Sequence, residues 1–449
     1  MKIMAFLLLA ICISCTGKTG DSGVSSGAGD SSKIQLKVLN YYDLSAPSAA
    51  QEIITVWDAF AEANPDIQII REDLTNEPFH NKTEVYAAAE SLPDVLYAWP
   101  SGRSTTLHEN KLLKDLTPFI DRDGIRSEYL PAALDPKGQS AGYLAMLPRA
   151  MTSSHAFYIN KEVLQDCGLE PAKTYAELKA QVPVLAAKGY GTALMANQDT
   201  WVMQSCLFSM IAGRFCGADW DKRILSGQAK FTDNDFIGAL NFIKTLYDDG
   251  VLSRSSLQTP YGEVIGQFAT NKGAYMIDGD WRSGNFITDP TTHQALIEPA
   301  RQTNFDVSVF PDIEGVKLNQ STSGIVGTGW GMSAGIPAGS PKEEAAWKLV
   351  KWLSGKEVQT FLLETGGVST PTITTIDMSA LKLEPIQITM TRLPRHYSTT
   401  TSVIDGVFHS DVFNPLNDGL QEIGMGTGST PEKVAANVQQ IFDAWKRSQ

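Results

Sequence analysis

An alternation of strand-like and helix-like segments most constrains the fold of this chain. Residues 34–39 alternate apolar and polar side chains as a strand does, and 67–70 and 94–98 are further short strand-like runs. Between them, 49–63 and 78–90 carry apolar side chains at helical spacing, and Asn-Pro ends the first of these helices. Strand, helix, strand, helix, strand predicts an α/β fold with a parallel sheet covered by helices.

The same alternation resumes later in the chain. Thr174 and Glu177 form a capping-box sequence that opens a helix, and 232–249 is a long amphipathic helix closed by glycine. Ser340 as N-cap, with proline next, predicts a helix at 341–353. The α/β pattern therefore extends over most of the chain.

Size and charge narrow the class further. A chain of 449 residues, roughly 415 after its leader, is too long for one hydrophobic core, so two domains are expected. The formal charge of -13 argues against nucleic acid as a partner, because nucleic acid selects basic surfaces. No apolar run after the leader is long enough to span a membrane.

The first residues predict export. A basic start is followed by eleven apolar residues, 3–13, which reach only about 16 Å as a helix and cannot cross a bilayer core of about 30 Å. Residues 1–14 are therefore predicted to be a signal peptide. Cys15 after a small residue resembles a bacterial lipobox, although Cys12 stands where leucine is usual, and 15–32 is predicted to be a lipidated cysteine with a flexible tether. An ordinary signal peptide with an incidental cysteine and a buried N-terminal helix are the alternatives.

The remaining cysteines predict neither a metal site nor a cofactor. Cys167, Cys206 and Cys216 are odd in number and lack zinc-ligand spacing, and the six histidines are scattered. Two interpretations stay open, a disulfide between Cys206 and Cys216 or three small buried thiols.

Several phrases resemble the family 1 extracellular solute-binding proteins of bacterial ABC importers, the class of maltose- and oligosaccharide-binding lipoproteins. In chain order they are LPDVLYAW at 92–99, LLKDLTPF at 112–119, GYLAMLP at 142–148, FYINK at 157–161, CGLEPAKTYAEL at 167–178, KGAYMIDGDW at 272–281, GTGWGMS at 327–333 and SPKEEAAWKLVKWL at 340–353. Together they cover roughly residues 33 to 372, while the stretch from about 373 matches only loosely.

The resemblance implies a two-lobed periplasmic-binding-protein fold, type II-like, with parallel-rich sheets and a hinge of several strands. It implies an N-lobe of 33–149 plus 303–331 and a C-lobe of 150–302 plus 332–449. Hinge crossings are expected near Pro148 to Ser154, near Thr303 and near Ser333 to Ile336.

Aromatic side chains at strand ends are the first candidates for a ligand site. Sugars stack their apolar faces on aromatic rings and need fixed polar groups for their hydroxyls. Trp99 follows a strand at the sheet edge where α/β proteins bind ligands. Asp280 and Trp281 end a turn that the family uses for stacking, and Arg282 is expected to bind a ligand hydroxyl or to pair with Asp280. Each of these residues has packing within its own lobe as the alternative.

A second candidate group follows the strand predicted at 192–196. It contains an amide, a carboxylate and an aromatic ring, in Asn197, Asp199 and Trp201. Asp199 equally suits a helix N-cap. The resemblance implies an aromatic side chain in the cleft at Trp201.

Three further residues complete the predicted ligand site. Asp43 follows the first strand, and Thr152 lies at the first hinge crossing, where maltose-binding members carry an acidic residue. This departure argues against a malto-oligosaccharide. Trp330 is expected near the cleft on a returning strand. By contrast, Trp57, Trp347 and Trp445, at helical spacing among apolar neighbours, are predicted to lie in the core.

These features predict a tethered, monomeric receptor in the cell envelope, facing periplasm or exterior, that delivers a carbohydrate to a membrane permease. No catalysis is expected, because the chain lacks HExxH and Cys/His signals. The alternatives are an exported carbohydrate-active enzyme using Asp278 and Asp280, a receptor for a non-sugar solute, and a binding protein for chemosensing.

Overall fold

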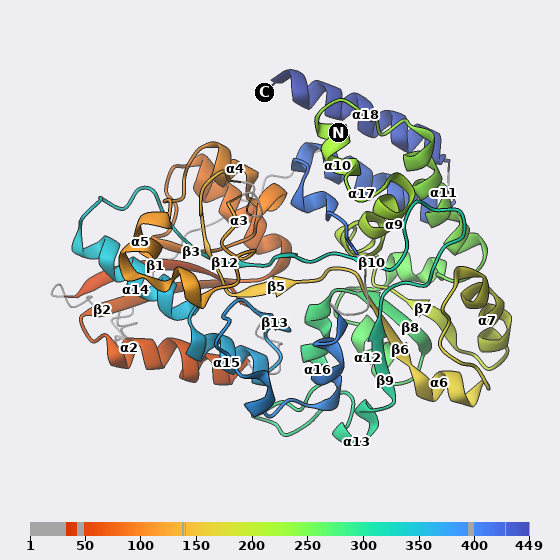
Figure 1. Cartoon of the computed structure of the whole chain (residues 1–449), viewed down its shortest axis with the longest axis horizontal. Coiled ribbons are helices and arrows are strands. Elements are labelled where there is room, and N and C mark those ends of the chain that lie inside the picture. The colour runs from red at the N-terminus through yellow and green to blue at the C-terminus, as the bar shows by residue number, and fades with distance from the viewer. Residues whose placement is uncertain are drawn as a thin grey trace, which may run out of the picture.

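The computed structural model describes residues 33–42, 49–136, 139, 141–393, 399–426 and 428–448, which form two lobes side by side (Figure 1). The predicted lipidation site Cys15 and the predicted ligand residue Asp43 lie outside these residues. Among the described helices, none is long and apolar enough to cross a bilayer.

The first lobe is built on a five-stranded sheet in the order β2-β1-β3-β12-β4. β1 pairs in parallel with β2 and β3, whereas β12 is antiparallel to its neighbours β3 and β4. Its elements are β1 (Ile34–Tyr41), α1 (Ala49–Glu52), η1 (Ile53–Asp58), α2 (Ala59–Ala63), β2 (Ile67–Leu74), α3 (Asn76–Ala88), β3 (Val95–Ala98), η2 (Ser101–Ser104), α4 (Thr105–Glu109), α5 (Thr117–Asp123), η3 (Ile125–Glu128), β4 (Leu147–Pro148), β12 (Gly329–Met332), α14 (Pro341–Leu353), α15 (Lys356–Glu364) and η7 (Met378–Ala380).

The second lobe is built on a four-stranded sheet in the order β7-β8-β6-β9. Alternate residues of β6 face two separate cores, with Phe157 and Ile159 in the larger one and Tyr158 in the smaller. Its elements are β6 (Ala156–Asn160), α6 (Lys161–Asp166), α7 (Tyr175–Ala187), β7 (Gly191–Leu194), α8 (Trp201–Met203), η4 (Gln204–Phe208), α9 (Ser209–Cys216), α10 (Trp220–Leu225), α11 (Asn234–Asp248), η5 (Arg254–Gln258), α12 (Val264–Ala269), β8 (Gly273–Asp278), η6 (Asp280–Asn285), α13 (Pro299–Gln302), β9 (Phe305–Ser308), α16 (Pro385–Met390), η9 (Ile404–Gly406), α17 (Ser410–Met425) and α18 (Pro431–Ser448).

Three short strands join the lobes. β5 (Ala150–Thr152) pairs antiparallel with β11 (Ile325–Val326) on one side and with β13 (Thr370–Pro371) on the other. Figure 1 shows β5 running from the first lobe toward the second. β10 (Ser321–Thr322) and β14 (Thr399–Thr400) form a separate parallel pair. The fold is therefore the two-lobed α/β arrangement with a multi-strand hinge.

Local sequence signals account for several element boundaries. Thr174 and Glu177 form the capping box at the start of α7, as their spacing predicts. The Ser340 side chain accepts a hydrogen bond from the Glu343 amide and opens α14 at the proline that follows.

The lobe boundaries differ from the expected ones in two places. β9, expected in the N-lobe segment 303–331, pairs with β6 in the second lobe. α14 and α15, expected in the C-lobe, pack into the core of the first lobe. The later crossings accordingly fall at β11 and β13, and not near Thr303 or Ser333 to Ile336. The lobe to which β9 or α14 and α15 belong cannot be predicted from neighbouring residues, because strand pairing and helix packing depend on residues far apart in the sequence.

The three cysteines among the described residues are free. Cys206 and Cys216 are buried without a disulfide, and Cys167 is half-buried. Of the two interpretations left open, the structure agrees with buried thiols.

Candidate ligand-binding site

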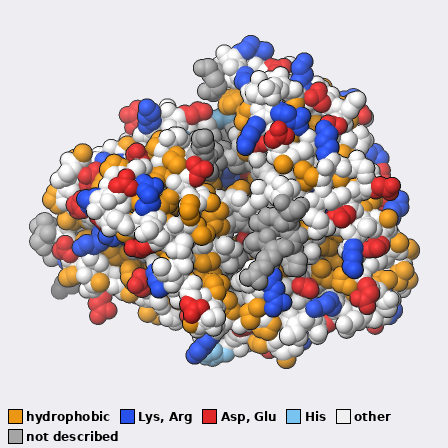
Figure 2. All heavy atoms as spheres, in the orientation of Figure 1, with side chains coloured by type: hydrophobic (Ala, Val, Ile, Leu, Met, Phe, Trp, Pro, Cys, Tyr) orange, Lys and Arg blue, Asp and Glu red, His pale blue; other side chains and the backbone are white. Residues whose placement is uncertain are grey.

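A cluster of rings lines the first lobe's side of the boundary between the lobes. Trp99, directly after β3, lies 4.9 Å from the ring centroid of Tyr41 and 4.8 Å from that of His80. Phe79 and Tyr97 complete this first aromatic group from below and are buried. Figure 2 shows hydrophobic side chains gathered along the first lobe's side of this boundary. The half-buried rings of Tyr41, His80 and Trp99 therefore rest on a packed apolar floor.

The second lobe contributes a second aromatic group of three half-buried rings, Trp201, Tyr261 and Trp281. The centroid of Tyr261 lies 5.0 Å from that of Trp201, and the two tryptophans are 6.3 Å apart. Trp201 opens α8 after β7, and Trp281 lies in η6 after β8, so neighbouring parallel strands place both rings at one edge of the sheet.

Arg103 connects the two groups. It lies on η2 of the first lobe, yet its guanidinium is 5.8 Å from the Trp201 ring, and its Nε donates to Asp405 Oδ2 of the second lobe at 3.1 Å. Burial, together with the nearby charge of Arg103, lowers the pKa of His80 to about 3. Arg103 therefore lies beside rings of both lobes, and the two aromatic groups border the same interlobe boundary.

The lobes also meet through their backbones at this edge. A Cβ atom on Gly102 would overlap the carbonyl oxygens of Asp405 and Phe408, so only glycine allows η2 to approach η9 this closely. The contact lies next to Arg103 and brings the first lobe against the second on one side of the site.

A buried ion pair supports the second aromatic group. Arg282 Nε donates to Asp278 Oδ2 at 2.8 Å, and its Nη2 donates to the Tyr261 carbonyl oxygen at 2.6 Å. Both charged side chains are nearly inaccessible. Because each charge is already paired and hydrogen-bonded, this part of the site offers no free ion to a ligand.

Asp280 lies between this group and the hinge. Its Oδ2 accepts a hydrogen bond from the Ser153 amide at 3.0 Å, and its carbonyl oxygen accepts one from the Ser369 hydroxyl. Ser153 follows β5 and Ser369 precedes β13, so Asp280 joins the second lobe to two crossing strands. Burial raises the pKa of Asp280 to about 7, against the lowering effect of neighbouring backbone amides.

The family of the chain follows from its sequence match. Residues 44–360 match the bacterial extracellular solute-binding proteins. The chain belongs to this family. The sequence phrases given above resemble family 1 of these proteins. Family 1 comprises solute-binding components of bacterial ABC importers.

Solved structures of similar proteins share the fold. One from a study of xylan utilization by Caldanaerobius polysaccharolyticus is 21% identical, with a TM-score of 0.78, covering 91% of this chain and 99% of its own. A chitin oligosaccharide binding protein is 19% identical, with a TM-score of 0.80 and coverages of 92% and 98%. The maltose- and maltodextrin-binding domain from Bdellovibrio bacteriovorus, bound to maltotriose, is 18% identical, with a TM-score of 0.67 and coverages of 92% and 100%.

Within this solute-binding fold, the structure brings four of the predicted site residues to the boundary or its hinge. Trp99, Trp201 and Trp281 are half-buried members of the two aromatic groups. Thr152 lies on β5, half-buried, with its hydroxyl close to Gly327 of the neighbouring crossing segment.

Three polar candidates support the site from within. Arg282 pairs with Asp278, whereas pairing with Asp280 was one of the expectations. Asp199 does not cap α8; its carboxylate accepts a hydrogen bond from the Tyr261 amide at 3.0 Å. Asp280 is 5% exposed and holds the hinge. These side chains orient other groups because their polar atoms already have protein partners.

Two candidates do not reach the boundary. Asn197 has no exposed surface, and its amide donates to Tyr247 and Ser256 inside the second lobe. Trp330 is 2% exposed in the first core, where its ring makes edge contacts with Trp57 and Tyr97. A strand-end position in the sequence did not distinguish these buried side chains from the exposed ones.

Five residues of the site were absent from the predicted set. They are Tyr41, His80, Arg103, Tyr261 and Asp405. Tyr41 ends β1, so its place at a strand end was a usable signal. The other four lie on helices or connections whose position in space depends on tertiary packing.

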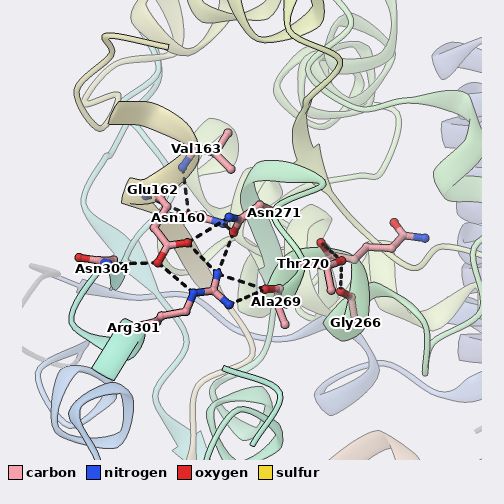
Figure 3. A network of polar contacts seen from close by, with 10 residues as sticks. Asn160, Glu162, Val163, Gly266, Ala269, Thr270, Asn271, Arg301 and Asn304 are labelled. Atoms are coloured by element: carbon pink, nitrogen blue, oxygen red, sulfur yellow. Dashed lines mark hydrogen bonds and ion pairs between the residues drawn. The ribbon is translucent and has the colours of Figure 1, made fainter. Parts of the chain in front are cut away.

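A second polar network lies at the opposite end of the second lobe's sheet (Figure 3). Arg301 donates to both carboxylate oxygens of Glu162, at 3.1 and 2.7 Å, and Asn271, Asn304 and Asn160 complete the cluster. The hydrogen bonds from Arg301 hold the pKa of Glu162 at about 2. Because the network joins the end of β6 to the starts of β8 and β9, it fastens three strand ends, and its polar groups are used internally.

Proposed function

We propose that this protein is an extracytoplasmic receptor that captures a carbohydrate between its lobes and delivers it to the permease of an ABC importer. The observation that carries the proposal is the pair of aromatic groups bordering one interlobe boundary, with Arg103 between them. Half-buried rings on both sides of one boundary suit the apolar C–H faces of pyranose units.

The charges at the boundary favour a neutral ligand. Arg103 pairs with Asp405, and Arg282 pairs with Asp278. The carboxylate of Asp280 is held by the Ser153 amide. A charged solute that used Arg103, Arg282 or Asp280 would have to displace one of these partners, whereas a sugar needs only neutral donors and acceptors for its hydroxyl groups.

The same arrangement disfavours glycoside hydrolysis. A glycosidase uses two carboxyl groups about 5 to 9 Å apart, both facing the scissile bond. Asp278 is enclosed by Arg282, and Asp280 faces the hinge, so neither carboxyl group is presented to a ligand. Binding followed by lobe rotation at β5, β11 and β13 is the mechanism we propose.

The proposal includes the placement of the protein. Residues 1–14 would direct export, Cys15 would carry the lipid, and 15–32 would tether the lobes to a membrane, facing periplasm or exterior. The receptor would act as a monomer. Similar folds that accompany xylan utilization or bind chitin oligosaccharide and maltotriose support carbohydrate as the ligand class.

Thermal-shift titrations of residues 33–449 test the ligand class. The panel contains mono-, di- and oligosaccharides, with polyamines and amino acids as controls. A ligand at 100 times its Kd adds about 2.7 kcal/mol and raises the Tm by several degrees. A shift with one sugar class supports the proposal; a shift with a control solute alone overturns its carbohydrate part. Loss of uptake of the bound sugar on gene deletion tests delivery, and loss of chemotaxis alone would contradict it.

A further inference from the structure

The indole of Trp281 is fixed from two directions. Its Nε1–H donates to the Tyr261 hydroxyl at 2.6 Å. The far end of the ring lies over Gly279, where a Cβ atom would overlap the six-membered ring. The ring therefore has a defined height and a defined rotation, and its one polar atom is already used.

Tyr261 is itself held on every side. Its hydroxyl donates to Asp278 Oδ1 at 3.4 Å, and its amide donates to Asp199. The guanidinium of Arg282 lies 3.5 Å from the centroid of the Tyr261 ring. Removal of the hydroxyl would leave the ring packing and the backbone hydrogen bond in place, and it would delete the acceptor for Trp281 together with the donor to Asp278.

Asp278 completes the chain of contacts. It has no exposed surface, and it accepts hydrogen bonds from Arg282 Nε and from the Gly279 amide, both at 2.8 Å. The Cys206 thiol lies 3.7 Å from the same carboxylate. Every polar group beneath the Trp281 ring thus has a partner inside the protein.

We propose that Tyr261 and Asp278 are positioning residues for Trp281, and that Trp281 contributes to ligand recognition by stacking alone. The inference rests on the proposed function, and it describes the second lobe's side of the proposed ligand site. It selects a ligand that presents an apolar C–H face to Trp281, and it assigns hydroxyl recognition to other side chains of the site.

The first experiment uses the ligand-free protein, residues 33–449, with ¹⁵N-labelled tryptophan. Nine indole N–H signals are expected, and Trp281→Phe identifies the signal of Trp281. In Tyr261→Phe that signal is expected to shift and to exchange faster with solvent, because the indole N–H has lost its acceptor. Tyr175→Phe is the matched control, since it removes a tyrosine–carboxylate hydrogen bond elsewhere in the same lobe. An unmoved Trp281 signal in Tyr261→Phe overturns the positioning role, whatever the ligand.

The second experiment measures the Kd of the sugar identified in the titration panel. Tyr261→Phe is expected to weaken binding about three- to tenfold, the usual effect of one lost hydrogen bond, while Tyr175→Phe leaves it unchanged. Gly279→Ala removes no hydrogen-bonding group but displaces the ring, and it is expected to weaken binding at least as much. An unchanged Kd in both Tyr261→Phe and Gly279→Ala overturns the inference. If the indole signal moves as expected but the wild-type protein binds no carbohydrate, the proposed function fails and stacking recognition fails with it.

Discussion

The first aromatic group and the second aromatic group form the two walls of the site, and they differ in how their rings are held in place. In the first lobe, Trp99 rests on Phe79 and Tyr97 and also contacts His80, and these contacts are between rings. In the second lobe, Trp281 is held by hydrogen bonds that lead to a buried ion pair. Apolar packing tolerates small shifts, whereas a saturated polar network has one low-energy arrangement. The comparison indicates an adaptable first wall and a pre-organised second wall.

The largest effect on sugar binding should come from a substitution in the pre-organised second wall. Trp281→Ala is expected to weaken sugar binding about 100-fold, about 2.7 kcal/mol, because it removes a ring whose position is already fixed. Isothermal titration measures the change. Trp445→Ala, which truncates a half-buried tryptophan on α18, is the control and should leave Kd unaltered. Equal losses in both variants would show that the effect reports general damage to the second lobe.

The next effect is on folding stability and concerns Asp280, which joins the second wall to the hinge. Its folded pKa of about 7 is above the unfolded value near 3.9, so the unfolded chain releases this proton first as pH rises. Stability from this group is therefore complete below about pH 4 and falls as pH rises toward 7.

Asp280→Asn should remove that loss. The variant is expected to match wild type at pH 4 and to be about 2 kcal/mol more stable at pH 8, measured by urea unfolding at both values. The pH 4 measurement is the internal control. A stability difference that is the same at both pH values would contradict the assignment.

A smaller effect on sugar binding is expected from a substitution in the adaptable first wall. Trp99→Ala should weaken binding about tenfold, about 1.4 kcal/mol, because Tyr41 and His80 remain to contact the sugar. Trp352→Ala is the control for loss of a tryptophan in the same lobe, because the Trp352 indole donates a hydrogen bond to the Val56 carbonyl oxygen and is not part of the first aromatic group. A loss for Trp99→Ala as large as that for Trp281→Ala would remove the distinction between the walls.

The smallest effect tests the contact between the walls. Arg103→Gln and Asp405→Asn are each expected to raise the dissociation rate about threefold, with a coupling of about 0.5 kcal/mol in the double-mutant cycle. Stopped-flow dissociation of the bound sugar measures both. Lys188→Gln, which breaks an exposed ion pair within one lobe, should have no effect. Strictly additive changes would show that Arg103 and Asp405 act independently.

Local sequence signals determined the class and many elements of this protein. The first strands and helices, the capping box at Thr174 and the start of α14 at Ser340 followed from neighbouring residues. Trp57 and Trp347 were correctly predicted to be core residues, because an apolar helical face is a local pattern with one common outcome.

Tertiary structure decided which side chains form the site. Trp330 and Trp281 both lie within two residues of a glycine in the sequence, yet Trp330 is enclosed between sheet and helices while Trp281 is half-buried at the boundary. Likewise, α14 was predicted correctly as a helix, but its packing in the first core depended on the sheet it covers. Hydrogen bonding within an element is local, whereas burial and pairing require residues far apart in the chain to meet. The sequence by itself therefore determined the elements and the family, and only the tertiary structure decided the two walls and the polar network beneath one of them.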